Sequence, residues 1–107
     1  MKEIDLIQYI KGGAGNRNIQ RIEWNPVLKR LDAGKLDPHK IEAAAASVIS
    51  TFPAKPQISS SELIKATGAP YFNTYLRAAI IKLWREGKVK LFLMNDDSRQ
   101  VRWSKVA

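Results

Sequence analysis

Residues 58–68 read ISSSELIKATG and carry the strongest local folding signal of the chain. Ser59 stands three residues before Glu62, so the side chain of each can bond the backbone N–H of the other in a capping box. Ile58 and Leu63 flank this pair at the spacing of a hydrophobic staple. Gly68 favours the left-handed conformation in which many helices end. The sequence therefore predicts a short capped helix that ends at about Thr67.

A longer helix is predicted just downstream, over residues 71–86. Ala69-Pro70 marks its start, since proline is tolerated in the first turn of a helix. Leu76, Ile80 and Leu83 recur at i, i+4 and i+7, which places them on one edge of the helix. This edge is predicted to be buried.

The hydrophobic period changes from 3.6 residues to 2 after Gly87, which supplies the C-terminal stop of that helix. Val89, Leu91 and Leu93 alternate with Lys88, Lys90 and Phe92, and Val101 and Trp103 alternate with Gln100 and Arg102. Residues 95–98 (NDDS) between them have the composition of a turn. The sequence therefore predicts a β-hairpin over residues 88–103.

Another helix is predicted upstream of the capped segment. It opens at Asp37-Pro38, an N-cap residue followed by proline at the first helical position. Its apolar residues share one face at helical spacing. They are Ile41, Ala44, Ala45, Val48, Ile49 and Phe52.

The first 36 residues have weaker patterns. Residues 4–11 have the spacing of a short amphipathic helix, and residues 14–21 have turn composition. Ile22 and Trp24 alternate with polar neighbours, which indicates a short strand. Asn25-Pro26 then opens a short helix that ends at Gly34. We expect this extension to pack on or beside the rest of the chain.

This order of elements resembles the winged helix-turn-helix superfamily of DNA-binding domains. The residues that carry the resemblance are 58–68, 73–89 (NTYLRAAIIKLWREGKV) and the hairpin at 88–103. It covers about residues 38–104. It implies a mainly α fold with a C-terminal β-hairpin: a winged-helix domain over residues 37–104, preceded by an N-terminal helical extension over residues 1–36.

The resemblance also implies which residues face DNA. In DNA-binding members, the N-terminal half of the helix predicted at 71–86 enters the major groove, and the hairpin at 88–103 is the wing. The core would then take Leu63, Ile64, Leu76, Ile80, Leu83 and Trp84. The N-terminal half of the helix would turn Thr74, Tyr75, Arg77 and Ala78 outward. Arginine is the residue type that reads guanine through two hydrogen bonds, which makes Arg77 the strongest candidate.

Other polar residues join Arg77 as candidates for DNA contacts. A helix N-terminus binds phosphate through free N–H groups, and lysines and arginines on the helix and wing attract phosphate. Lys82 and Arg85 are equally explained as solvated positions on a helix that buries its other face. The full candidate set is Ser60, Asn73, Thr74, Tyr75, Arg77, Lys82, Arg85, Lys88, Lys90, Arg99 and Arg102.

The charge of the chain favours a polyanionic partner, here double-stranded DNA. Its 107 residues contain 18 Lys and Arg against 10 Asp and Glu, a formal net charge of +8. Residues 39–107 hold eleven of these cations and five of the acids. Basic surface potential of this kind steers nucleic acid towards a protein.

Two features favour a different function. Ala78 and Ile81 are apolar where groove-facing helices usually carry polar groups, and Asp96-Asp97 would repel phosphate at the wing tip. An exposed Ile81 indicates a protein contact, such as a homodimer, or packing by the N-terminal segment. The alternative is therefore a winged-helix interaction or dimerisation module without sequence-specific DNA binding.

Patterns for catalysis are missing. The chain has no cysteine and a single histidine, His39, so no metal site is expected. Residues 12–15 (GGAG) lack the Gly-Lys-Ser/Thr of a phosphate loop, and no GxSxG elbow occurs. We expect neither an enzyme, nor a cofactor, nor a small-molecule substrate. The longest apolar runs have four residues and the N-terminus is unlike a secretory signal, so we expect a cytoplasmic protein without a membrane partner.

Overall fold

The capped segment forms helix α4 (Ser60–Thr67) in the computed structural model, which describes residues 2–11, 18–69, 73–93 and 101–106. Ser59 Oγ accepts a hydrogen bond from the Glu62 N–H at 3.2 Å, and the Ser59 N–H donates to Glu62 Oε1 at 3.3 Å. Gly68 ends the helix with a φ of 77°. Ile58 and Leu63 are both fully buried. The predicted capping box and the end of this helix are confirmed.

Helices α3 (Pro38–Thr51) and α5 (Thr74–Arg85) also follow the sequence closely. Asp37 caps α3, because its side chain accepts a hydrogen bond from the His39 N–H at 2.9 Å. Helix α5 begins later than predicted. Its N-cap is Asn73, which has an extended backbone and accepts from the Leu76 N–H at 2.8 Å. The first predicted positions, 71 and 72, lie outside the described residues.

The predicted hairpin forms the middle of a four-stranded antiparallel sheet. Strands β3 (Val89–Leu93) and β4 (Val101–Lys105) pair with Leu91 opposite Trp103. Strand β1 (Lys2–Ile4) flanks β3, and strand β2 (Ile58–Ser59) flanks β4, so the order is β1-β3-β4-β2. The predicted turn at 95–98 lies outside the described residues. The chain is therefore mainly helical with a C-terminal hairpin, and the sequence did not predict the two edge strands.

The start of the chain differs from the single helix predicted over residues 4–11. Ile4 belongs to β1, where it lies opposite Leu91 and is buried. Helix α1 (Leu6–Ile10) starts only after Asp5, whose side chain accepts from the Gln8 N–H at 3.1 Å. Because Asp5 is an N-cap residue, the helix cannot begin at Ile4. Pairing with strand β3, which is distant in the sequence, determines the conformation of the residues before helix α1.

Residues 18–32 form one helix, α2 (Asn18–Asp32), so the short strand predicted at Ile22 and Trp24 is wrong. Pro26 lies inside this helix rather than at its start. Trp24, Val27 and Leu28 are all buried, and their i, i+3, i+4 spacing is that of one helix face. Burial of this face on both sides of Pro26 outweighs the hydrogen bond that proline removes from the helix, which costs about 3 kcal/mol.

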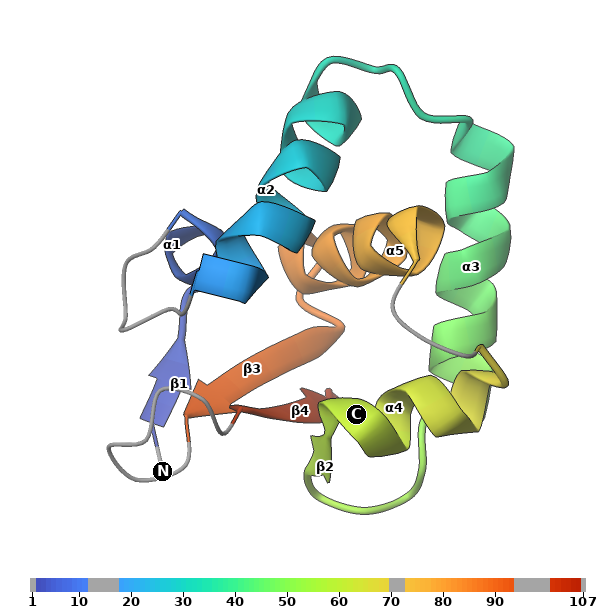
Figure 1. Cartoon of the computed structure of the whole chain (residues 1–107). Helices are drawn as coiled ribbons and strands as arrows, with labels where there is room; N and C mark the ends of the chain where they lie inside the picture. Colours follow the sequence, from blue (N-terminus) through green and yellow to red (C-terminus); the bar gives the residue numbers. More distant parts are fainter. Residues whose placement is uncertain (1, 12–17, 70–72, 94–100, 107) are drawn as a thin grey trace.

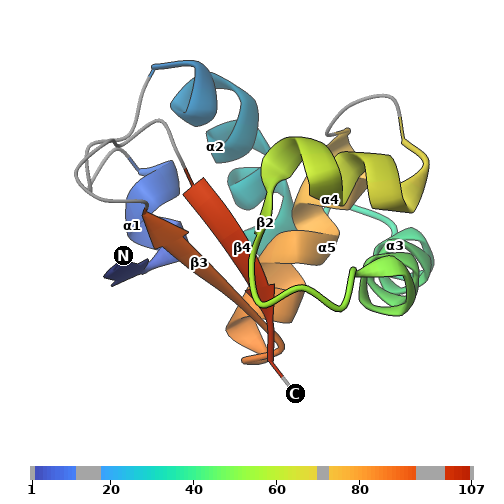
Figure 2. The ribbon, with the colours of Figure 1, turned by 90° about the horizontal axis from the view of Figure 1, so that it is seen from below.

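Helix α5 lies at the centre of the molecule, between α2 and α3 and beside the hairpin strands (Figure 1). Helix α4 follows directly from β2 and lies next to β4 (Figure 2). Of the predicted core residues, Leu63, Leu76, Ile80 and Leu83 are buried, whereas Ile64 and Trp84 are half-buried. One hydrophobic cluster includes these residues together with residues of α1, α2 and β4. The N-terminal elements thus share a core with the hairpin.

Candidate nucleic-acid interface

The outward face predicted for α5 is partly covered: Ala78 is buried, whereas Thr74, Tyr75 and Arg77 are half-buried. Arg77, Ala78, Ile81 and Arg85 lie on one stripe of the helix, because residues four apart are neighbours on its surface. We call these four residues the α5 stripe. Ala78 and Ile81 have no solvent exposure, so the expectations that Ala78 points outward and that Ile81 is an exposed protein contact are wrong. The physical reason is helix α2, which packs against α5 and is contacted by the first and last residues of the stripe.

Arg77 is half-buried against an aromatic pair. Its guanidinium carbon lies 5.7 Å from the ring centroid of Trp24, within the range of a cation–π interaction. The Trp24 ring in turn stacks on Trp103, with centroids 6.1 Å apart and an interplanar angle of 21°. The arginine predicted to read DNA thus forms the end of a stack that joins α5, α2 and β4.

Arg85 is held by the last residue of α2. Its two terminal nitrogens lie 2.7 and 3.3 Å from the carboxylate oxygens of Asp32, a bidentate ion pair. The hydrogen bond from Arg85 lowers the pKa of Asp32 below its usual value of 3.8. A guanidinium occupied in this way loses its favourable carboxylate contact if it turns to a phosphate.

Lys82 lies between two carboxylates from different helices. Its Nζ is 2.6 Å from Glu86 on the turn after α5 and 3.4 Å from Glu42 on α3. The hydrogen bond to Glu86 is the main reason that the pKa of Lys82 is raised. Lys88 also lies 3.4 Å from Glu86. Lys82 and Lys88, which were both predicted to contact DNA, therefore have acidic partners within the chain.

The cations predicted for the wing have acidic neighbours too. Lys90 Nζ lies 3.7 Å from Glu3 on the adjacent strand β1, and Arg102 lies 3.7 Å from Glu62 at the start of α4. Exposed pairs of this length contribute little to stability, but they reduce the net positive potential along the hairpin. Arg99 and the Asp96-Asp97 pair lie outside the described residues.

The uncharged candidates have structural roles in most cases. Ser60 Oγ accepts a hydrogen bond from Trp103 Nε1–H at 2.9 Å, and the Asn73 side chain caps α5. Tyr75 Oη accepts from the Asp37 N–H at 3.0 Å, which ties the loop before α3 to α5. Thr74 is half-exposed in the first turn of α5. The structure therefore pairs the side chains of most of the predicted site residues with other residues of the chain, and none of these side-chain contacts joins two of the described site residues directly.

Comparison of the chain with protein-family models, with curated proteins and with solved structures gives no match.

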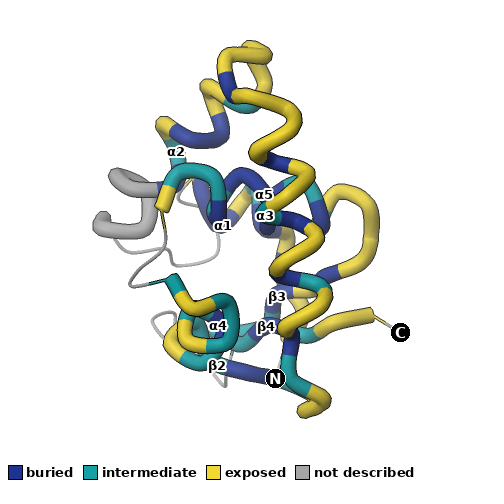
Figure 3. The backbone as a smooth tube through the Cα atoms, turned by 90° about the vertical axis from the view of Figure 1, so that its right-hand side faces the viewer, coloured by how far each residue is buried: buried dark blue, intermediate teal, exposed yellow. Residues whose placement is uncertain are grey.

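Four exposed cations lie between the last turn of α2 and the first turn of α3, and none of them is among the DNA contacts predicted from the sequence. Lys29 and Arg30 lie in the last turn of α2, Lys35 in the following loop and Lys40 in the first turn of α3. We call these four residues the α2–α3 corner. Within the described part of the chain none of them forms an ion pair. The end of α2 and the start of α3 lie at the top of Figure 1, and Figure 3 shows this region as mostly exposed.

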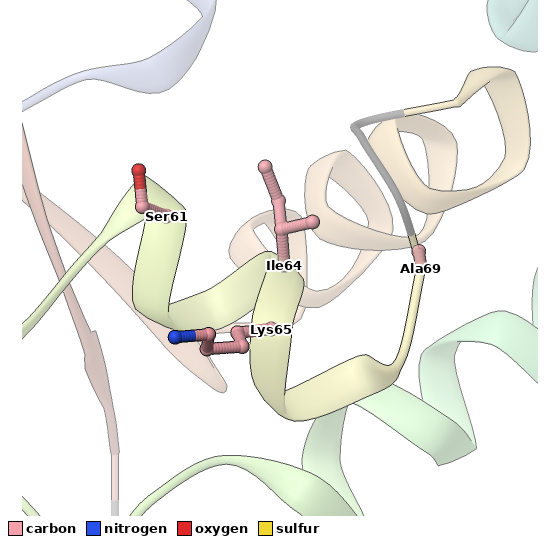
Figure 4. A pocket seen from close by; sticks show the side chains of 4 residues that line it. All are labelled: Ser61, Ile64, Lys65 and Ala69. Atoms are coloured by element: carbon pink, nitrogen blue, oxygen red, sulfur yellow. The ribbon is translucent and has the colours of Figure 1, made fainter.

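A shallow hollow lies on α4, which is at the bottom of Figure 1, away from the α2–α3 corner. It has a volume of about 270 Å³ and is lined by Ser61, Ile64, Lys65 and Ala69. In Figure 4 the side chains of Ser61 and Ile64 point to the same side, while Lys65 extends along the outside of the helix. One hydroxyl and one amine beside an apolar floor do not make a catalytic arrangement.

Other kinds of site are not found in the part of the chain that the structure describes. No group of three or more His, Cys, Asp or Glu side chains could hold a metal ion among those residues. The described helices also include none with the length and apolar character needed to cross a membrane.

Proposed function

We propose that the chain is a winged helix-turn-helix protein that binds double-stranded DNA chiefly through the sugar–phosphate backbone. The order of elements supports the fold. A helix (α3), a capped short helix (α4) and a longer helix (α5) precede the hairpin β3–β4, and β2 pairs with the outer side of β4. This is the order on which the resemblance to the winged-helix superfamily rests.

The observation that carries the DNA proposal is the imbalance between engaged acids and free cations. Every carboxylate side chain that the structure describes is engaged by an ion pair or a helix cap. These are Glu3, Asp5, Asp32, Asp37, Glu42, Glu62 and Glu86. Exposed lysines and arginines remain without such partners, most of all at the α2–α3 corner. A surface on which exposed cations exceed the acids attracts a polyanion.

Binding through the backbone follows from the cover over α5. Side chains must reach base edges in a groove to read sequence, whereas phosphate contacts need only exposed cations. Ala78 and Ile81 are fully buried, and Arg77 and Arg85 on either side of them contact residues of α2. Reading of bases by the α5 stripe is therefore not part of this proposal. Asn73 and Thr74 at the N-terminal end of α5 remain accessible to a phosphate.

Titration of a fluorescently labelled, random-sequence DNA duplex at several salt concentrations tests the proposal. Each neutralised phosphate contributes about 0.9 to the slope of log K against log salt concentration. We expect a slope of about −4 or steeper, with little difference between duplexes of unrelated sequence. Failure to bind the duplex at low salt, or an affinity that does not change with salt, would contradict the proposed function.

The interaction module suggested by the sequence has lost its main support. That hypothesis depended on Ile81 and Ala78 being exposed, and both are fully buried. Val106 is the only large apolar side chain classed as exposed among the described residues, at 38%. A protein–protein interface is usually built around a contiguous apolar patch, which a single exposed valine does not provide.

A further inference from the structure

We propose that the DNA backbone docks on the α2–α3 corner, so that α2 rather than α5 faces the nucleic acid. This inference rests on the proposed function and names its site. The ligand is a row of phosphates, and the groups that would bind it are the side chains of Lys29, Arg30, Lys35 and Lys40.

The corner has a net positive charge because it carries four cations against two acids, Asp32 and Asp37, and neither acid is paired with any of the four. Asp32 forms the bidentate pair with Arg85, and Asp37 caps α3 through the His39 N–H. Lys40 Nζ lies 5.6 Å from the ring centroid of Tyr75, a contact that leaves its three N–H donors able to bind phosphate. The four cations thus face solvent without a carboxylate to compete for them among the described residues.

The backbone of the corner is fixed rather than loose. The N–H groups of Ala33, Gly34 and Lys35 donate to carbonyls of the last turn of α2 at 3.0 to 3.1 Å, and Gly34 adopts the left-handed conformation with φ of 69°. Leu36 is buried, and the Asp37 N–H is bonded to Tyr75 on α5. A surface ordered before binding loses less conformational entropy when a partner arrives.

Helix α2 has two faces that suit this arrangement. Trp24, Val27 and Leu28 on its inner face are buried towards the core, whereas Lys29 and Arg30 are exposed. The inner face covers the α5 stripe, which in the winged-helix resemblance is the surface that meets DNA. The cations of its exposed end, continued by Lys35 and Lys40, then supply positive charge without a carboxylate partner, whereas Arg77 and Arg85 of the stripe are held by Trp24 and Asp32.

Two variants with equal net charge test the inference. The corner variant carries Lys29→Gln, Arg30→Gln, Lys35→Gln and Lys40→Gln. The control variant carries Lys2→Gln, Lys55→Gln, Lys65→Gln and Lys105→Gln, which removes four cations from β1, the loop after α3, α4 and β4. All eight positions are exposed, so both proteins should fold, and thermal unfolding followed by circular dichroism checks this.

The salt dependence of binding to a random DNA duplex is then compared with that of the unmodified protein. We expect the slope of log K against log salt concentration to become less negative by about 3 to 4 units in the corner variant, since four phosphate contacts are lost. Its affinity at about 0.1 M salt should fall more than tenfold. The control variant should keep its slope to within about one unit. Equal losses in both variants, or a larger loss in the control, would overturn the corner as the site while leaving DNA binding intact. Absence of salt-dependent binding by the unmodified protein would instead overturn the proposed function.

Discussion

The α5 stripe and the α2–α3 corner contain the same kinds of charged side chain in opposite circumstances. In the stripe, Arg77 lies against Trp24 and Arg85 is paired with Asp32, so the positive charges serve to attach α2. At the corner, Lys29 and Lys35 have no such partners among the described residues. The difference shows that a basic residue on a recognition-like helix says little about binding until its neighbours are known.

Truncation of a buried residue should separate the two regions most clearly. Ile81→Ala in the stripe should lower the free energy of unfolding by about 2–5 kcal/mol, because it leaves a cavity beneath α2. Lys35→Ala at the corner should change it by no more than about 0.5 kcal/mol, since Lys35 is exposed. Urea denaturation measures both values. Similar values for the two variants would contradict the burial of the stripe.

Arg77 offers the next largest effect, and it distinguishes a structural arginine from one that reads DNA. Arg77→Ala should lower the free energy of unfolding by about 1–2 kcal/mol, because a half-buried cation–π contact with Trp24 is lost. At a temperature where the variant is folded, its DNA affinity should stay within about twofold of the original. Arg77→Lys, which keeps a cation near the ring, is the matched control. A loss of DNA affinity of about tenfold or more in a stable Arg77→Ala protein would show that Arg77 is part of the DNA-binding surface.

The smallest expected effect concerns the ion pair that fastens the end of α2. Arg85 lowers the pKa of Asp32, so the pair stabilises the fold above about pH 4, where Asp32 is ionised even in the unfolded chain. This contribution is lost as the pH falls through the lower pKa of the folded state. Asp32→Asn should therefore cost about 0.2–1 kcal/mol at pH 7, with the difference from the original protein shrinking below pH 4.

Urea denaturation of both proteins at a series of pH values measures that difference, and Glu42→Gln serves as a control for loss of an exposed acid. A difference that is independent of pH would show that Asp32 does not stabilise the fold through its charge.

Local signals predicted a large part of the fold. Three of these signals involve residues close in sequence, so they can be recognised without a structure. They are the capping box of Ser59 and Glu62, the cap at Asp37 and the stop at Gly87. Strand β1 and helix α2 were missed because both depend on distant partners. Lys2–Ile4 is extended because it pairs with β3, and α2 continues through Pro26 because its face packs on α5 and β4.

The candidate site was predicted less well, for the same reason. The sequence places Arg77, Lys82 and Arg85 on one helix, but their partners Trp24, Glu42 and Asp32 come from other elements. The burial of Ile81 likewise depends on α2. The corner was overlooked because it joins two helices whose spatial relation no local pattern reveals.

Nuclear magnetic resonance mapping of the backbone amides during titration with a random-sequence DNA duplex tests the central claim most directly. We expect the amide signals of residues 29–40 to shift in proportion to DNA added, and these shifts to disappear at high salt, because the contacts are electrostatic. The signals of residues 77–85 should stay in place, since α2 covers that face of α5. Shifts concentrated in residues 77–85, with residues 29–40 unaffected, would contradict it.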